Sequence, residues 1–143
     1  MKFTKHLILL AFLLLQSVSA FAANWVFVGE SANSQYYIDK ESMIRTGSKV
    51  QCWMRTNYND PQTEKYPIVD TNNKYSSDLS YSEYDCYNRT LRGLEFNSYS
   101  EKDGGGSVVK SHSFTSSTPL IRIPPGTVAE AVMKFVCKLS MKK

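Results

Sequence analysis

The sequence predicts an α+β domain, in which a single antiparallel sheet of about six strands is covered on one face by a C-terminal helix. Short runs rich in β-branched and aromatic residues alternate with polar turns from residue 25 to residue 114. Residues 128–139 instead repeat their apolar side chains with the period of an α-helix. The chain of 143 residues is 42% hydrophobic and 21% charged, which is typical of one folded domain and not of a disordered chain.

The N-terminus has the pattern of a cleaved secretory signal. Two lysines precede an almost wholly apolar run, 7–15, and Ala20 and Ala22 are small residues of the kind that signal peptidase recognises. An uncleaved anchor is the competing interpretation, but the run is shorter than the roughly 20 residues that cross a bilayer. We therefore expect a signal peptide at 1–22, a mature domain at 23–143, and export to the periplasm or the medium.

The mature chain carries neither a lipid-attachment signal nor a strong charge. Bacterial lipoproteins place a cysteine directly after the cleavage point, whereas the first cysteine here is Cys52, so we expect no lipid anchor. The full chain holds 17 basic and 13 acidic residues, and two of the basic ones lie in the signal. So mild a balance excludes a dedicated nucleic-acid binder.

The first two strands are expected at 25–29 and 35–39. Both are short apolar runs, and the polar residues 31–34 form a turn that lets them pair. A brief turn is expected at 40–43, and Gly47 lies in a break before the next strand.

The next two strands, 49–58 and 80–88, alternate their side chains between two faces. In the first of them, one face holds Val50, Cys52 and Met54, and the other holds Gln51, Trp53 and Arg55. In the second, one face holds Ser82, Tyr84 and Cys86, and the other holds Tyr81, Glu83, Asp85 and Tyr87. The segment between them, 59–77, contains two prolines and no sustained periodicity, so we expect a long loop.

Two further strands, 92–100 and 108–114, are joined by a flexible glycine-rich tip. The helix follows a Pro-Pro-Gly turn, and its expected N-cap is Thr127, with Glu130 reaching back in a capping box. The apolar arc of this helix is so broad that the sheet is the only surface able to cover it.

The mature chain has three cysteines, Cys52, Cys86 and Cys137, and export would place them in an oxidising compartment where disulfides persist. They allow three single pairings, and sequence spacing does not choose among them. A bond between Cys86 and Cys137 would close a loop of about 51 residues and contribute about 4 kcal/mol. The leftover thiol either joins two chains or is buried as a small hydrophobe.

One helix covers only one face of such a sheet. If Cys137 bonds Cys86, the opposite face carries aromatic and charged residues, namely Trp53, Arg55, Tyr81 and Tyr87, with Trp25, Phe27 and Tyr99 as further candidates. Such a patch indicates a partner, either a second copy or a ligand. The alternatives are that the loop 59–77 folds over it, or that the tyrosines lie at a wet surface.

No catalytic residues are predicted. His112 is the only histidine outside the signal and has no flanking carboxylate, which argues against a Ser-His or Cys-His nucleophile. Glu83 and Asp85 lie on one face roughly 7 Å apart, a spacing that glycosidases use, but we expect them to be solvated charges. Without a C-x-x-C pair we expect no zinc site, and we expect no cofactor of any kind.

Several spaced motifs together resemble the surface-adhesin protein E family of Gram-negative bacteria. They are WVFVGE at 25–30, YYID at 36–39 followed by Ser42-Met43, the strand at 50–53, Asp85-Cys86, and IPPGT at 123–127 leading to Val136-Cys137. Their order and spacing carry the resemblance, which covers nearly all of the mature chain.

The resemblance implies that a disulfide from Cys86 to Cys137 ties the helix to the concave side of the sheet. It also implies adhesion to host matrix or plasma proteins such as vitronectin, laminin and plasminogen, with a homodimer as a further possibility. The host-binding stretch would fall on 74–92, whose basic residues Lys74, Arg89 and Arg92 join the candidate partner-binding residues. The alternative function is a periplasmic protein that binds, inhibits or assists an envelope enzyme.

Overall fold

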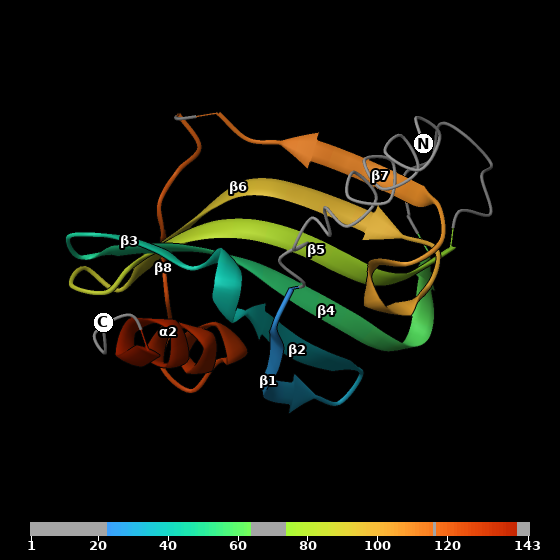
Figure 1. Ribbon diagram of the computed structural model, residues 1–143, viewed down its shortest axis with the longest axis horizontal. Coiled ribbons are helices and arrows are strands. Elements are labelled where there is room, and N and C mark those ends of the chain that lie inside the picture. The colour runs from blue at the N-terminus through green and yellow to red at the C-terminus, as the bar shows by residue number, and fades with distance from the viewer. Residues whose placement is uncertain (1–22, 64–73, 116, 140–143) are drawn as a thin grey trace, which may run out of the picture.

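The computed structural model describes residues 23–63, 74–115 and 117–139, which form one antiparallel sheet and one helix (Figure 1). The strands are β1 (Trp25–Ser31), β2 (Ser34–Asp39), β3 (Ile44–Thr46), β4 (Lys49–Thr63), β5 (Lys74–Asp85), β6 (Thr90–Tyr99), β7 (Val108–Ser113) and β8 (Ile121–Arg122). Two 3-10 turns, η1 (Lys40–Ser42) and η2 (Lys102–Gly104), and the helix α2 (Val128–Leu139) complete the described elements. The main strand order is β1-β2-β4-β5-β6-β7, with β3 beside β4 and β8 beside β6.

The predicted fold class is confirmed for the antiparallel sheet and the C-terminal helix, but the sheet has eight strands and not six. The two additional strands are β3, with three residues, and β8, with two. Neither is long enough to show an alternating pattern. Both are defined by their pairing with β4 and β6, which the sequence does not reveal.

The prediction of a long loop at 59–77 is wrong at both of its ends. β4 continues to Thr63 and β5 already begins at Lys74, so these two residues pair with each other. The pairing register shifts between Asn57 and Gln62, and this irregular stretch accommodates Pro61, which has no amide N–H to donate to a ladder. Residues 64–73 of the predicted loop lie outside the described residues.

The predicted capping box starts α2. The hydroxyl of Thr127 accepts a hydrogen bond from the Glu130 amide at 3.2 Å. The Glu130 carboxylate accepts from the amide of Gly126, one residue before the expected partner, at 2.8 Å. This amide, together with Arg89 and Lys134, lowers the pKa of Glu130 to about 2.

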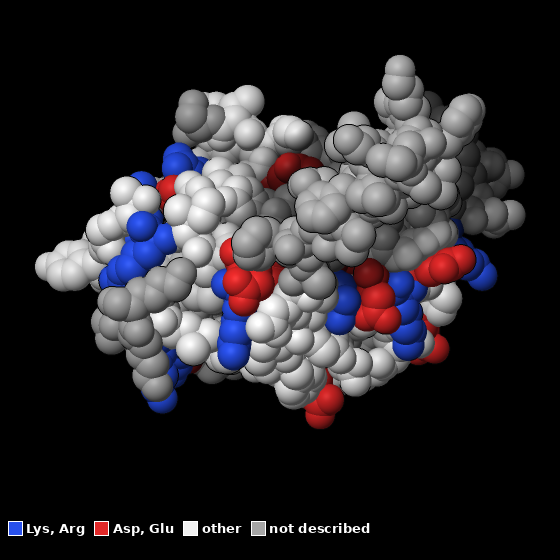
Figure 2. Space-filling model, viewed as in Figure 1, with Lys and Arg blue, Asp and Glu red and all other residues white. Residues whose placement is uncertain are grey.

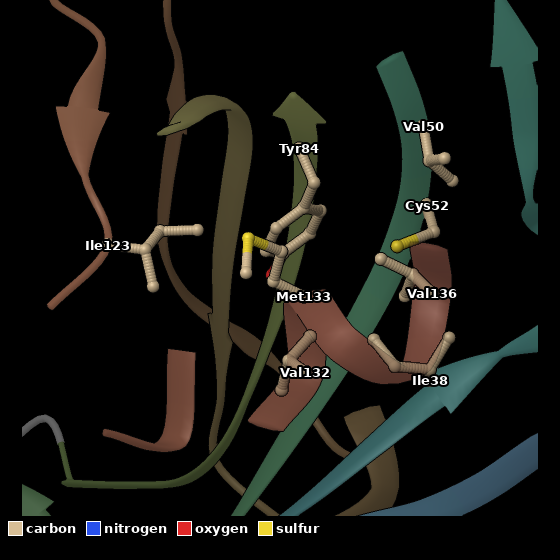
Figure 3. Packing of buried hydrophobic residues seen from close by; sticks show 8 residues of the cluster. All are labelled: Ile38, Val50, Cys52, Tyr84, Ile123, Val132, Met133 and Val136. Atoms are coloured by element: carbon tan, nitrogen blue, oxygen red, sulfur yellow. The ribbon is translucent and has the colours of Figure 1, made fainter. Parts of the chain in front are cut away.

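The core gathers residues of the sheet and of the helix in one buried cluster (Figure 3). The sheet and its C-terminal connection contribute Ile38, Val50, Cys52, Tyr84 and Ile123, and α2 contributes Val132, Met133 and Val136. Burial, with a smaller effect of Asp39, raises the pKa of Cys52 to about 12. The leftover thiol is therefore a buried, protonated side chain that packs as a small hydrophobe.

The predicted disulfide is present between Cys86 and Cys137, whose Cα atoms are 5.8 Å apart. It joins the end of β5 to α2, which are 51 residues apart in the sequence. The bond lies at the edge of the buried cluster, which Cys86 and Cys137 contact as partly buried residues.

Candidate functional site

The outer face of the sheet is the face turned away from the buried cluster, and its centre is an aromatic pair. Because Cys52 and Tyr84 are buried, the side chains that alternate with them in β4 and β5 point the other way. Trp53 lies directly opposite Tyr81 in the pairing register, and their ring centroids are 5.2 Å apart. Both side chains are partly exposed. The structure therefore brings together two of the predicted partner-binding residues.

Arg55, a third predicted residue, is clamped on the same face. Its guanidinium carbon lies 4.7 Å from the ring centroid of Trp25 and 4.7 Å from that of Tyr37. One guanidinium nitrogen is 3.1 Å from the carboxylate of Asp103, and only 12% of the Arg55 side chain is exposed. Two cation–π contacts and an ion pair hold its position, so Arg55 contributes more to the rigidity of this face than to a free charge.

The tip that contains η2 folds back against one end of the outer face. Asn57 and Asp103 exchange two hydrogen bonds of 2.8 and 2.9 Å. The amide of Gly104 donates to the Ser77 hydroxyl at 3.0 Å. Part of the outer face is thus covered by residues of the β6–β7 connection, which the sequence predicted only as a flexible hairpin tip.

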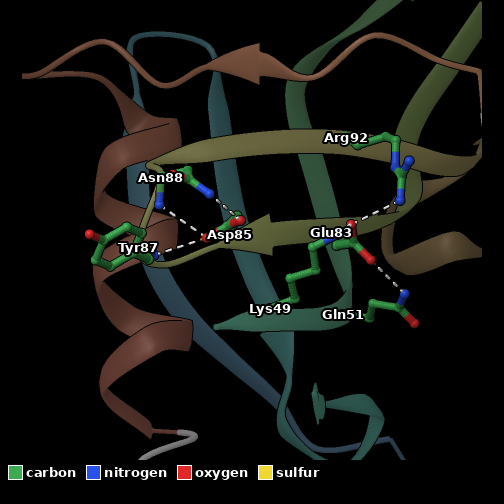
Figure 4. A network of polar contacts seen from close by, with 7 residues as sticks. All are labelled: Lys49, Gln51, Glu83, Asp85, Tyr87, Asn88 and Arg92. Atoms are coloured by element: carbon green, nitrogen blue, oxygen red, sulfur yellow. Dashed lines mark hydrogen bonds and ion pairs between the residues drawn. The ribbon is translucent and has the colours of Figure 1, made fainter. Parts of the chain in front are cut away.

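A polar network beside the aromatic pair contains a buried carboxylate (Figure 4). Glu83 is only 6% exposed and pairs with Lys49 at 3.1 Å and with Arg92 at 2.9 Å. Gln51 donates to the same carboxylate at 3.0 Å and accepts from the Tyr81 hydroxyl at 3.1 Å. The prediction that Glu83 is a solvated charge is wrong, because long side chains from the neighbouring strands enclose it.

Asp85 is also buried, at 7% exposure, and its carboxylate stabilises the turn after β5 instead of facing solvent. Its carboxylate accepts from the amides of Tyr87 and Asn88, each at 3.0 Å, and from the Asn88 side chain at 2.9 Å. These bonds, those from Asn88 above all, lower the pKa of Asp85 below its usual range. Glu83 and Asp85 are therefore each engaged in separate structural contacts, Glu83 between β4, β5 and β6 and Asp85 in the turn after β5.

We expect acid to destabilise the protein through these carboxylates. Burial alone would raise the pKa of Glu83, but the hydrogen bonds from Gln51 and Lys49 and the charges of Lys49 and Arg92 lower it overall. A carboxyl group whose pKa is lowered by folding stabilises the native state above its unfolded pKa, roughly 4, and loses that effect as the pH falls through the folded pKa. Thermal melts should therefore show little change between about pH 6 and 8 and a falling Tm below about pH 4.

The variant Glu83→Gln tests this assignment, since it removes the charge and keeps the size. It should lower the free energy of unfolding at pH 7 by about 2 kcal/mol, the usual value for a hydrogen bond to a charged group, and flatten the acid dependence. Glu41→Gln, in exposed η1, is the matched control and should change neither quantity. An unchanged acid profile in Glu83→Gln would show that other groups govern acid unfolding.

The remaining candidates do not join the aromatic pair. Lys74 and Tyr87 lie at opposite ends of β5, and Tyr87 is 85% exposed in the turn after that strand. Arg89 belongs to the same turn and forms an ion pair of 2.6 Å with Glu130 of α2. Arg92 reaches the outer face, where it pairs with Glu83. The candidates therefore divide between the outer face and the turn beside the disulfide, apart from Lys74, which lies at the start of β5.

Three residues of the outer face were not among the predicted partner-binding residues. Tyr37 stacks on Arg55, Asp103 pairs with it, and Gln51 links Tyr81 to Glu83. The alternation of 49–58 had placed Gln51 on the correct face, but no local pattern shows that it would meet a carboxylate 32 residues later. Tyr37 and Asp103 depend in the same way on which strands become neighbours.

In residues 23–63, 74–115 and 117–139, no three His, Cys, Asp or Glu side chains gather closely enough to hold a metal ion. In those same segments no helix has the length and hydrophobicity needed to span a bilayer. The ring of His112 packs edge-on against Phe114, with 4.5 Å between centroids.

Comparison with known proteins gives a consistent result. Residues 25–138 match the family model described as surface-adhesin protein E. The structure of crystal form II of Haemophilus influenzae protein E is 19% identical, with a TM-score of 0.62 over 90% of this chain and 98% of that chain. Another structure of that protein has a TM-score of 0.59 at 19% identity, over 90% of this chain and 95% of that one. At these identities the structural likeness shows the fold, and no curated protein sequence matches the chain.

Proposed function

Because the chain belongs to the surface-adhesin protein E family, we propose that it is an exported, non-enzymatic module that binds host matrix or plasma proteins. The residues of α2 belong to the buried cluster, so the outer face on the other side of the sheet is left for this purpose. The observation that carries the proposal is the Trp53–Tyr81 pair, two partly exposed rings on a rigid sheet. Tryptophan and tyrosine dominate the binding energy of many protein interfaces, because they bury large areas at little entropic cost.

The charges of this protein favour recognition by shape and aromatic contact over long-range attraction. Among the described residues on the side seen in Figure 2, blue basic and red acidic side chains are interspersed. Within the proposed host-binding stretch 74–92, Arg89 and Arg92 are engaged with Glu130 and Glu83. A complex of this kind should depend only weakly on salt.

Solid-phase binding of the oxidised domain 23–143 to vitronectin, laminin and plasminogen, with albumin as the control, tests the function. We expect saturable binding to at least one of the three and a change of less than about threefold between 50 and 300 mM salt. No selective binding to any of them would contradict the adhesin proposal. It would favour the alternative, a periplasmic protein that binds, inhibits or assists an envelope enzyme.

The variants Trp53→Ala and Tyr81→Ala should each weaken that binding by about 10-fold or more, as expected for central aromatic contacts. Tyr87→Ala tests separately whether the turn beside the disulfide contributes to binding, because Tyr87 is exposed in that turn and not on the outer face. Lys134→Ala, at a side chain of α2 that is 64% exposed, is the control and should bind as the parent does. Full binding by both Trp53→Ala and Tyr81→Ala, with unchanged circular dichroism, would exclude the outer face as the binding surface.

A further inference from the structure

The two edges of the sheet differ in how they are protected. β1 forms one edge, and it has a register irregularity between Phe27 and Gly29 and lies beside α2 (Figure 1). β7 forms the other edge of the main strand order and, among the described residues, pairs only with β6. An edge strand that lacks a second neighbour presents a row of main-chain donors and acceptors to any extended chain.

The hydrogen-bond pattern identifies which groups of β7 face outward. The Phe114 amide, just past β7, donates to the Leu94 carbonyl of β6 at 2.9 Å. Since hydrogen-bonded pairs recur at every second residue, His112 also exchanges its main-chain bonds with β6, and Ser111 and Ser113 direct theirs away from it. The ladder becomes irregular only at the start of β7, between the partners of Ser98 and Tyr99.

The side chains along this edge indicate the chemistry of a partner. No acidic residue occurs between Asp103 and Glu130, whereas β8 carries the basic residue Arg122. Exposed apolar side chains also follow the edge: Val108 at 56%, Phe114 at 39%, Leu120 at 56% and Ile121 at 59%. A complementary strand would therefore carry acidic residues among apolar ones.

We propose that the outer edge of β7 binds an extended, acidic segment of a partner protein by strand addition. This inference rests on the proposed function, since it gives a protein-binding module a second docking surface, apart from the Trp53–Tyr81 pair. The main chain of Ser111 and Ser113 supplies the hydrogen bonds, and the exposed apolar side chains of this edge, together with Arg122 of β8, select the partner.

A pair of substitutions at one position tests the proposal. Ser111→Ala and Ser111→Pro both remove the hydroxyl that donates to Asn97 at 2.6 Å, but only proline removes the outward amide. Proline is tolerated where the N–H of an edge strand faces away from the sheet, so both variants should fold. The probe is a blocked, fluorescent peptide with the sequence Thr-Glu-Val-Glu-Val-Glu-Thr, and its Lys-for-Glu version is the charge control.

We expect the acidic peptide to bind the parent and Ser111→Ala within about twofold of each other and Ser111→Pro at least 10-fold more weakly. The lysine peptide should bind the parent at least 10-fold more weakly than the acidic one. Equal binding to Ser111→Pro, or no binding to the parent at 1 mM peptide, would overturn the proposal. So would a dimer of the parent that Ser111→Pro dissociates, because a second copy would then occupy the edge. If the acidic peptide binds and none of the matrix or plasma proteins does, only the proposed adhesin function is contradicted. If a matrix or plasma protein binds and the peptide does not, only the proposed strand addition is contradicted.

Discussion

Replacing both Cys86 and Cys137 by alanine should lower the free energy of unfolding by about 4 kcal/mol. The disulfide closes a loop of 51 residues, and a loop of that length removes much of the conformational freedom of the unfolded chain. Small domains have only about 5–15 kcal/mol of stability in total, so this single bond accounts for a large part of it. In a thermal melt the double variant should unfold roughly 15 °C below the parent.

The matched control for this experiment is the same melt in the presence of a reducing agent. The parent should fall to the Tm of the double variant, whereas the double variant should not respond, because its remaining thiol, Cys52, is already reduced. A parent whose Tm does not change on complete reduction would contradict the assigned role of the bond. Peptide mapping without reduction should show Cys86 linked to Cys137 and to no other cysteine.

The second large effect is expected for Ile38→Ala, at a cost of about 3 kcal/mol in the free energy of unfolding. Ile38 is fully buried and belongs to the cluster that unites β2 and β4 with α2. Removing its side chain leaves a cavity between sheet and helix that neither element can close without moving, and Ile38→Val should cost only about 1 kcal/mol. Urea unfolding monitored by circular dichroism measures both changes.

Ile44→Ala is the matched control, because it deletes the same atoms from a side chain that is 56% exposed. Its free energy of unfolding should change by no more than about 0.5 kcal/mol. If Ile38→Ala were no more destabilising than Ile44→Ala, sheet and helix would not share one core.

The contacts on both faces of the sheet explain how this small domain keeps Trp53 and Tyr81 ordered although they are partly exposed. The buried cluster and the disulfide secure one face, and the outer face is held by ion pairs and hydrogen bonds around Glu83 and Arg55. Trp53 and Tyr81 are therefore kept in place by their neighbours and need no buried position to be ordered. A rigid, partly exposed aromatic pair loses little conformational entropy when a partner binds.

Local patterns predicted those parts of this protein that depend on neighbouring residues in the sequence. The alternation of 49–58 separated Cys52 from Trp53 correctly, because side chains in any strand alternate between faces. The capping box at Thr127 was also recoverable, since its partners are three residues apart. The choice of Cys86 and Cys137 as the disulfide needed the family resemblance, because three cysteines alone leave three pairings open.

By itself, then, the sequence determined the class of the fold, the two faces of its strands and the start of its helix. The tertiary structure decided the rest: the added strands β3 and β8, the extension of β4 to Thr63, and the burial of Glu83. Each of these depends on which strands become neighbours and in which register, and that is set by long-range pairing between segments with no local signature. For the same reason, only the tertiary structure showed that Arg55 is clamped between two rings and that β7 lies at an edge of the sheet.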